Sequence, residues 1–292
     1  MQPSLILIPM MILSLVITKL IHTYASPVLS IINRWLRWFV LAVGFTEISL
    51  YFDWFQQSFE TLFAAFFIGW FLIDSIYRWL TISAISVSPL PLFPRFKLNP
   101  SGDQWPVQGR FLKLRDTLRE KGFNHMQALR SEVSTHFQLR VSVYQKADSH
   151  LRLQVSFLPH PGGNLSLCFQ FTTRLVDGTC LVTDNHFLPF AGFYSENWLV
   201  QRKPNTRSFL QLLNYHERRV TLSGKQSVAW DTEPVVDLNT QQAELERINT
   251  EMGFLLPHNL HDEHGRISYE GRYRIWKEML TLNYFGKPAV YH

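Results

Sequence analysis

The first eighty residues carry three long apolar segments that are separated by short polar gaps. The segments predict helices at about residues 4–21, 35–52 and 59–80. A helix that crosses a bilayer needs about 20 apolar residues, or about 17 at the short end. Backbone polar groups in lipid must be paired within the segment, so apolar stretches of this length are expected to be helical. The pattern predicts a transmembrane region over residues 1–85.

A proline-rich stretch follows at residues 86–106. Proline lacks a backbone donor and interrupts helices, so this stretch is expected to be a semi-stiff linker. Residues 107–292 are numerous enough to form a core of their own. This part opens with a predicted basic amphipathic helix at Arg110–Lys121, which either lies on the lipid surface or packs on the domain.

Alternation of apolar and polar residues then predicts a set of strands. Four are expected, with a fifth after them: Phe137–Val143, Leu151–Phe157, Leu165–Phe171, Thr179–His186 and Trp198–Lys203. The gaps between them are short, and Asp177-Gly178 is a strong hairpin signal. We therefore expect an antiparallel meander with one apolar and one polar face. The polar face would carry Gln138, Arg140, Arg152, Gln154, Ser166, Cys168 and Gln170.

Three helices with 3.6-residue periodicity come after the strands, at Thr206–Val220, Gln241–Leu256 and Tyr269–Phe285. We expect them to cover the apolar face of the sheet. Strands followed by helices indicate an α+β domain.

Charged residues around the apolar segments predict the orientation in the membrane. Lys19, Arg34 and Arg37 lie in or near the first gap, whereas Asp53 and Glu60 bound the second. The positive-inside rule then puts the N-terminus outside and the C-terminal domain in the cytoplasm, and the compact charge pattern suggests a bacterial inner membrane. In the alternative, residues 1–25 are a signal peptide cleaved after Ala25 and the domain is exported, although the leader lacks a positive charge.

Ionisable residues inside a bilayer are functional candidates because they are costly there. Asp74 has Arg78 one helical turn away, and Arg37 reaches a similar depth on the neighbouring helix, so an ion pair that locks the hairpin is expected. Glu47 has no basic neighbour. A transport role for Glu47 and Asp74 is a further hypothesis, although three helices are few for a conduction path.

Composition narrows the function classes. The chain has 28 basic and 23 acidic residues. After Lys97 there are 22 basic and 19 acidic residues, which is a small basic excess. This weak, unclustered excess argues against a nucleic-acid-binding surface. Two cysteines, Cys168 and Cys180, fall on adjacent predicted strands; reduced thiols are expected, with a disulfide as the alternative.

Candidate chemistry is sparse. There is no phosphate-binding glycine loop, no nucleophile elbow and no Cys-x-x-Cys pair. The best signal is His258, His261 and His264, which are spaced to ligate zinc or another divalent metal, with Glu263 as a possible base. Asp184-Asn185-His186 closes the fourth strand and is either a polar site at a sheet end or a turn.

These features support two main hypotheses. In the first, the three helices anchor a cytosolic α+β domain that binds a protein partner or acts as a regulatory module, through the polar sheet face or the basic helix. In the second, the chain is a membrane-bound metal-dependent enzyme that uses the histidine cluster and zinc. No reaction or ligand follows from the sequence.

Overall fold

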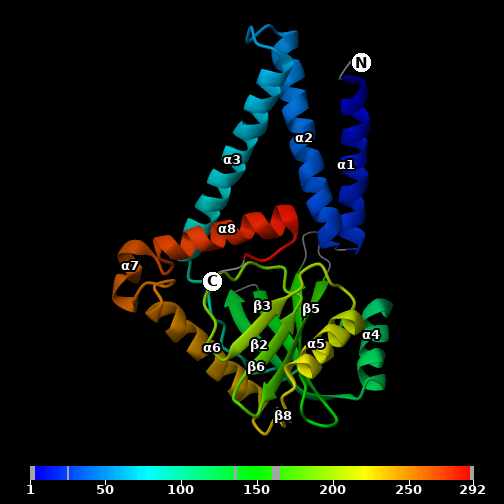
Figure 1. Cartoon of the computed structure of the whole chain (residues 1–292), viewed down its shortest axis with the longest axis vertical. Helices are drawn as coiled ribbons and strands as arrows, with labels where there is room; N and C mark the ends of the chain where they lie inside the picture. The colour runs from blue at the N-terminus through cyan, green and yellow to red at the C-terminus, as the bar shows by residue number, and fades with distance from the viewer. Residues whose placement is uncertain (1–3, 25, 135–136, 160–164, 290–292) are drawn as a thin grey trace.

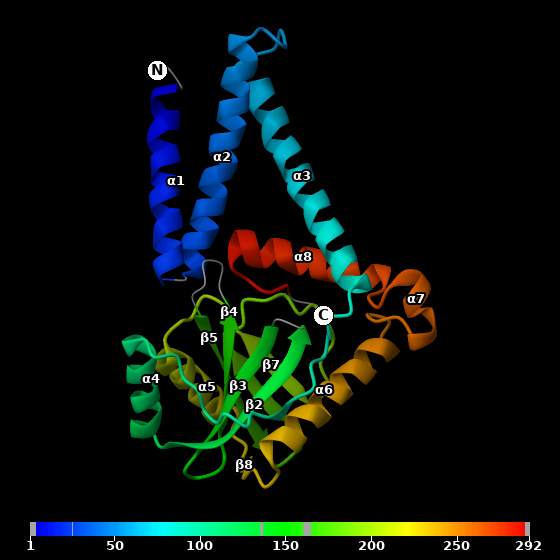
Figure 2. The same cartoon turned by 180° about the vertical axis from the view of Figure 1, so that it is seen from behind.

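The computed structural model describes residues 4–24, 26–134, 137–159 and 165–289 (Figure 1). Three N-terminal helices, α1 (Ser4–Tyr24), α2 (Pro27–Tyr51) and α3 (Phe59–Val87), are long and apolar enough to cross a membrane. They lie on one side of a folded domain: α1 runs toward the domain, α2 runs away from it and α3 runs back to it. α2 and α3 converge at their far ends and diverge toward the domain (Figures 1 and 2).

The second helix begins at Pro27, eight residues earlier than predicted, and the third continues to Val87. Ser26 caps α2 by accepting a hydrogen bond from the backbone N–H of Leu29 (3.4 Å), and proline suits the first helical position. The prediction of a long polar gap between the first two helices was therefore wrong. Arg34 and Arg37 lie in the first turns of a helix rather than in a loop.

The C-terminal part is an α+β domain, as expected. Within the described residues one sheet of eight strands has the order β1-β2-β3-β4-β5-β6-β7, and β8 pairs with β5. Neighbours are antiparallel except for the parallel pair β6 and β7. The strands are β1 (Lys97–Leu98), β2 (Phe123–Ser134), β3 (Phe137–Lys146), β4 (Arg152–Pro159), β5 (Leu165–Leu175), β6 (Cys180–Asp184), β7 (Trp198–Arg202) and β8 (Ser227–Val228).

Helices cover both faces of this sheet, which corrects the expectation that they cover one. α4 (Gly109–Glu120) and α5 (Phe209–Ser223) pack on the face that carries the largest apolar cluster. α6 (Pro234–Glu251) packs on the opposite face, where its Leu238 belongs to one apolar cluster with Val141 and Val143 of β3. Because α4 contributes Phe111 and Leu118 to the core, it packs on the domain.

The register between β3 and β4 explains why helices cover both faces of the sheet. Val143 lies opposite Gln154, and Tyr144 lies opposite Leu153. Directly paired residues share a face, so the apolar residues of β3 point to the side that was expected to be polar. That side is largely covered: Arg152 and Cys168, both expected on an open polar surface, are 4% and 1% exposed.

Residues 86–106 pack against the domain rather than standing free as a spacer. Phe93, Phe96 and Trp105 are buried, and β1 extends the sheet beside β2. After α6 come two short helical turns, η1 (His258–Leu260) and α7 (His261–His264). The last helix, α8 (Tyr269–Phe285), does not cover the sheet's apolar face as expected. It crosses between the diverging ends of α2 and α3, on top of the domain (Figures 1 and 2).

Candidate functional site

A row of polar side chains crosses the α6-covered face of the sheet. The register pairs Gln154 of β4 with Gln170 of β5, Gln170 with Asp184 of β6, and Asp184 with Arg202 of β7. Each pair shares a face, so the four side chains follow one another across four strands. We call these residues the polar row.

The polar row is the floor of a cavity of about 290 Å³. The loop after β6 supplies Phe190 and Tyr194 to its wall, α6 supplies Gln241 and Gln242, and the segment before β1 supplies Phe93. A second cavity of about 570 Å³ adjoins the first and extends under α8. The two share part of their lining: Phe190, Tyr194, Trp198, Val200 and Arg202. Together they form the sheet pocket.

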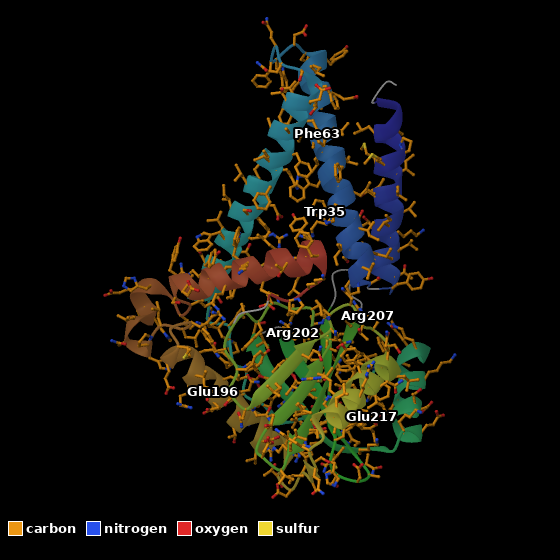
Figure 3. The ribbon with its side chains drawn as sticks, viewed as in Figure 1. Trp35, Phe63, Glu196, Arg202, Arg207 and Glu217 are labelled. Atoms are coloured by element: carbon orange, nitrogen blue, oxygen red, sulfur yellow. The ribbon has the colours of Figure 1, made fainter. Side chains whose placement is uncertain are left out.

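Arg202 holds the charged side of the sheet pocket together. Its guanidinium contacts the carboxylate of Glu278 on α8 (2.5 Å) and lies 3.6 Å from that of Asp184. It also donates to the backbone carbonyl of His186 (3.0 Å). Figure 3 shows Arg202 beneath α8. Burial raises the pKa of Glu278, and the contact with Arg202 opposes that rise. The side chains of Asp184, Arg202 and Glu278 are thus engaged with one another.

The amides of the polar row have no hydrogen-bond partner among the described residues. Within the part of the chain that the structure describes, the side chains of Gln154 and Gln170 make no hydrogen bond to protein. Both are only partly exposed. An amide offers donors and an acceptor at once, so this floor can bond a ligand edge that carries both kinds of group.

The α6 roof is anchored by a buried ion network. Asp237 contacts Arg152 (2.6 Å) and Arg174 (2.5 Å), and both guanidiniums lie 4.0 Å from the ring of Trp230. Loss of one partner from such a buried network would leave an uncompensated buried charge. The free-energy cost of that loss keeps the three charged side chains together. The roof is therefore fixed to strands β4 and β5.

Two of the predicted candidate residues line the pocket. Asp184 belongs to the polar row, and His186 lies beside it with its ring nitrogen 3.4 Å from the Asp184 carboxylate. The same segment is also a turn, because Asp184 accepts a hydrogen bond from the backbone N–H of His186 (2.9 Å). Asn185 instead ties the sheet to the chain before α5, bonding the backbone of Phe169 and Thr206.

The predicted histidine cluster lies away from the pocket, in η1 and α7. The rings of His258 and His261 are 4.7 Å apart, and His264 is near Glu263 at 3.6 Å. His261 is bonded through its Nε2 to the backbone carbonyl of Leu256 (2.6 Å). Across residues 4–289, outside the undescribed gaps, no group of three or more His, Cys, Asp or Glu side chains is arranged to hold a metal ion.

The intramembrane candidates separate into three environments. Asp74 and Arg78 form the expected ion pair at 2.6 Å, and Asp74 also accepts from the hydroxyl of Tyr284 on α8 (2.9 Å). Arg37 does not join them; it donates to Thr18 of α1 (2.9 Å). Glu47 makes no hydrogen bond or ion pair with any residue that the structure describes.

Cys168 and Cys180 are free cysteines, the first buried and the second partly exposed. Burial raises the pKa of the Cys168 thiol to about 12, so it stays protonated at neutral pH. A neutral buried thiol is a packing group rather than a nucleophile.

Arg202, Glu278 and the roof residues of the pocket were not among the sequence candidates. Alternation in the sequence put Gln154 and Gln170 on one face, but nothing local in the sequence marks the contact between Arg202 and Glu278, which are 76 residues apart. Comparisons of the chain with protein-family models, curated proteins and solved structures find no match.

Proposed function

We propose that this protein is a membrane-anchored binding module whose sheet pocket takes a small, uncharged, polar molecule. The observation that carries the proposal is the polar row under the α6 roof, with two amides that make no hydrogen bond to any described residue. Pockets of this size, with apolar walls and a few convergent polar groups, are the usual form of small-molecule sites.

The charges around the pocket favour an uncharged ligand. Arg202 contacts Glu278 and lies near Asp184, and Arg274, which also lines the pocket, donates to the carbonyl of Ala191. These charged side chains are engaged with other protein groups. The aromatic rings of Phe190 and Tyr194 offer flat apolar contact area, with their centroids 4.8 Å apart. A planar heterocycle with donors and acceptors along one edge fits these groups.

The finer location is also a proposal. We place the N-terminus outside and the domain in the cytoplasm, in a bacterial inner membrane. Lys19, Arg34, Arg95 and Lys97 lie toward the domain end of the helices, while Asp53 lies in the loop at the far end. This charge distribution is the one that the positive-inside rule favours for a cytoplasmic domain.

The test is a binding screen on the full chain in detergent. We expect an uncharged heterocycle, from a panel of nucleosides and their bases, to bind more tightly than anions of similar size. Gln170→Leu removes a hydrogen-bonding amide from the floor and should weaken binding about three- to tenfold. Titration calorimetry measures the dissociation constants.

Gln138→Leu is the matched control, because Gln138 is an exposed glutamine on β3 outside the pocket. It should bind as the parent does. Equal affinity of Gln170→Leu and the parent for every ligand found, or a preference for anions, would contradict the proposal.

A further inference from the structure

α8 carries a stripe of large side chains along one side. Tyr269, Tyr273, Trp276 and Leu280 follow one another at intervals of four, three and four residues. At about 100° per residue they fall within a sector of about 60°. We call them the aromatic stripe. Tyr269 is 77% exposed and Tyr273 is 45% exposed, while Trp276 and Leu280 are partly buried.

The opposite side of α8 is packed on the domain. Gly271 lies so close to the Phe254 carbonyl that a Cβ there would be 2.4 Å from its oxygen. Arg274 donates to the carbonyl of Ala191 (2.9 Å), and Glu278 pairs with Arg202. The aromatic stripe therefore points away from the domain.

Both ends of that side contact the membrane-spanning helices. Tyr269 packs edge-on against Trp79 of α3, with ring centroids 5.3 Å apart. At the other end, Tyr284 packs against Trp35 of α2 (5.5 Å) and donates to Asp74 of α3. Figure 3 shows Trp35 beside the C-terminal end of α8. The middle of the stripe must then face the space between the diverging ends of α2 and α3 (Figures 1 and 2).

The residue types of the stripe, and its position along the three apolar helices, match those of a helix at the membrane–water interface. Tyrosine and tryptophan have an apolar body and a polar tip, and they gather where acyl chains meet headgroups. Trp35 and Trp79, which contact the same side of α8, sit at the domain ends of two apolar helices. A helix with one aromatic side and one polar side, running across the ends of spanning helices, has the character of an interfacial helix.

We propose that α8 lies in the bilayer interface and that its aromatic stripe contacts phospholipid between α2 and α3. The lipid's headgroups lie at the level of α8, and its acyl chains run along the apolar surfaces of α2 and α3. This inference rests on membrane insertion of the three apolar helices, and it is independent of the ligand in the sheet pocket.

Spin labels on single cysteines test the proposal. In a background with Cys168→Ala and Cys180→Ala, the full chain carries Tyr273→Cys or Trp276→Cys and is placed in nanodiscs of phosphatidylcholine and phosphatidylglycerol. Leu222→Cys is the control, because Leu222 is 74% exposed on α5 at the outside of the domain. For each label we compare the collision rate with oxygen, which partitions into lipid, to the collision rate with a water-soluble nickel chelate. We expect this ratio to be severalfold higher for the stripe labels than for the control label.

Two results would overturn the proposal. If the nickel chelate reaches the stripe labels as readily as the control label, the stripe lies in water. If neither reagent reaches them, protein covers the stripe, as in contact with a second copy. Each variant must elute like the parent from size exclusion, and Leu280→Cys replaces any that does not.

Discussion

At the scale of single residues, His216 is a titratable group of the domain whose pKa is shifted far from its ordinary value. It lies fully buried on α5, between the hydroxyls of Thr173 (3.0 Å) and Thr183 (2.9 Å). Burial, with a smaller effect from the nearby charge of Arg219, lowers its pKa from 6.5 to about 3. His216 is a neutral structural group that joins α5 to strands β5 and β6.

This pKa predicts how stability depends on pH. The unfolded chain takes up a proton on His216 as pH falls below about 6.5, whereas the folded chain does so only near 3. Stability should therefore be highest above pH 6.5 and fall as the pH drops toward 3. The contribution of this residue between pH 7 and pH 5 is about 2 kcal/mol.

Denaturant unfolding of the detergent-solubilised chain at both pH values measures this contribution. The His216→Gln variant lacks the titrating imidazole. Whatever its absolute stability, its free energy of unfolding should therefore change less between pH 7 and pH 5 than that of the parent. His264→Gln should keep the full change, because His264 is exposed on α7. An unchanged pH dependence in His216→Gln would show that the buried imidazole is not its source.

At the scale of elements, α8 joins three parts of the molecule: α3 through Tyr269, α2 and α3 through Tyr284, and the sheet pocket through Glu278. The Trp35 indole also donates to the backbone carbonyl of Tyr284 (2.9 Å), so the helix end is bonded through side chain and main chain. These contacts connect one wall of the sheet pocket to α2 and α3.

Tyr284→Phe should loosen this attachment. The change removes the hydroxyl that donates to Asp74 but keeps the ring between Trp35 and Trp38. A hydrogen bond to a charged group contributes about 1.5 kcal/mol, so amide exchange in the last turns of α8 should be about tenfold faster. Hydrogen exchange with mass spectrometry measures the rate.

Tyr273→Phe is the comparison for this experiment, because it removes a hydroxyl from the same helix at a half-exposed position. It should leave the exchange of the last turns unchanged. Equal protection in Tyr284→Phe and the parent would mean that the bond to Asp74 does not hold α8 in place.

The same elements show what the sequence could predict. Strong alternation identified β3, β4 and β5, and periodicity gave α8 its observed limits of Tyr269 and Phe285. β2 was missed because bulges at His125/Gln127 and Glu132/Ser134 shift its register and break the alternation.

The sequence could not predict on which face of the sheet the apolar side chains of β3 lie. Alternation within one strand does not determine which of its residues pair with which residues of the next strand. The turn between Lys146 and Arg152 determines this pairing, with Ser149 in the left-handed region (φ 60°), and places Val143 opposite Gln154. The sheet pocket was hidden for the same reason: its floor was interpreted as an open surface, and its roof and charged wall come from α6 and α8. Only Asp184 and His186 were recognisable as candidates from local sequence.

At the scale of the whole molecule, the arrangement is an anchor, a crossing helix and a domain with a pocket. Three apolar helices run alternately, so the start of α1 and the domain lie at opposite ends of the bundle (Figure 1). Basic residues gather at the domain end and Asp53 lies at the far end, in the loop before α3. The proposed orientation places the domain at the cytoplasmic face of the membrane.

Cysteine labelling in intact cells measures this placement directly. In the cysteine-free background, Gln56→Cys lies in the exposed loop between α2 and α3, and Leu222→Cys lies on the domain. We predict that a membrane-impermeant maleimide labels Gln56→Cys in intact cells and labels Leu222→Cys only after the cells are permeabilised. Labelling of Leu222→Cys in intact cells, with Gln56→Cys protected, would contradict the account.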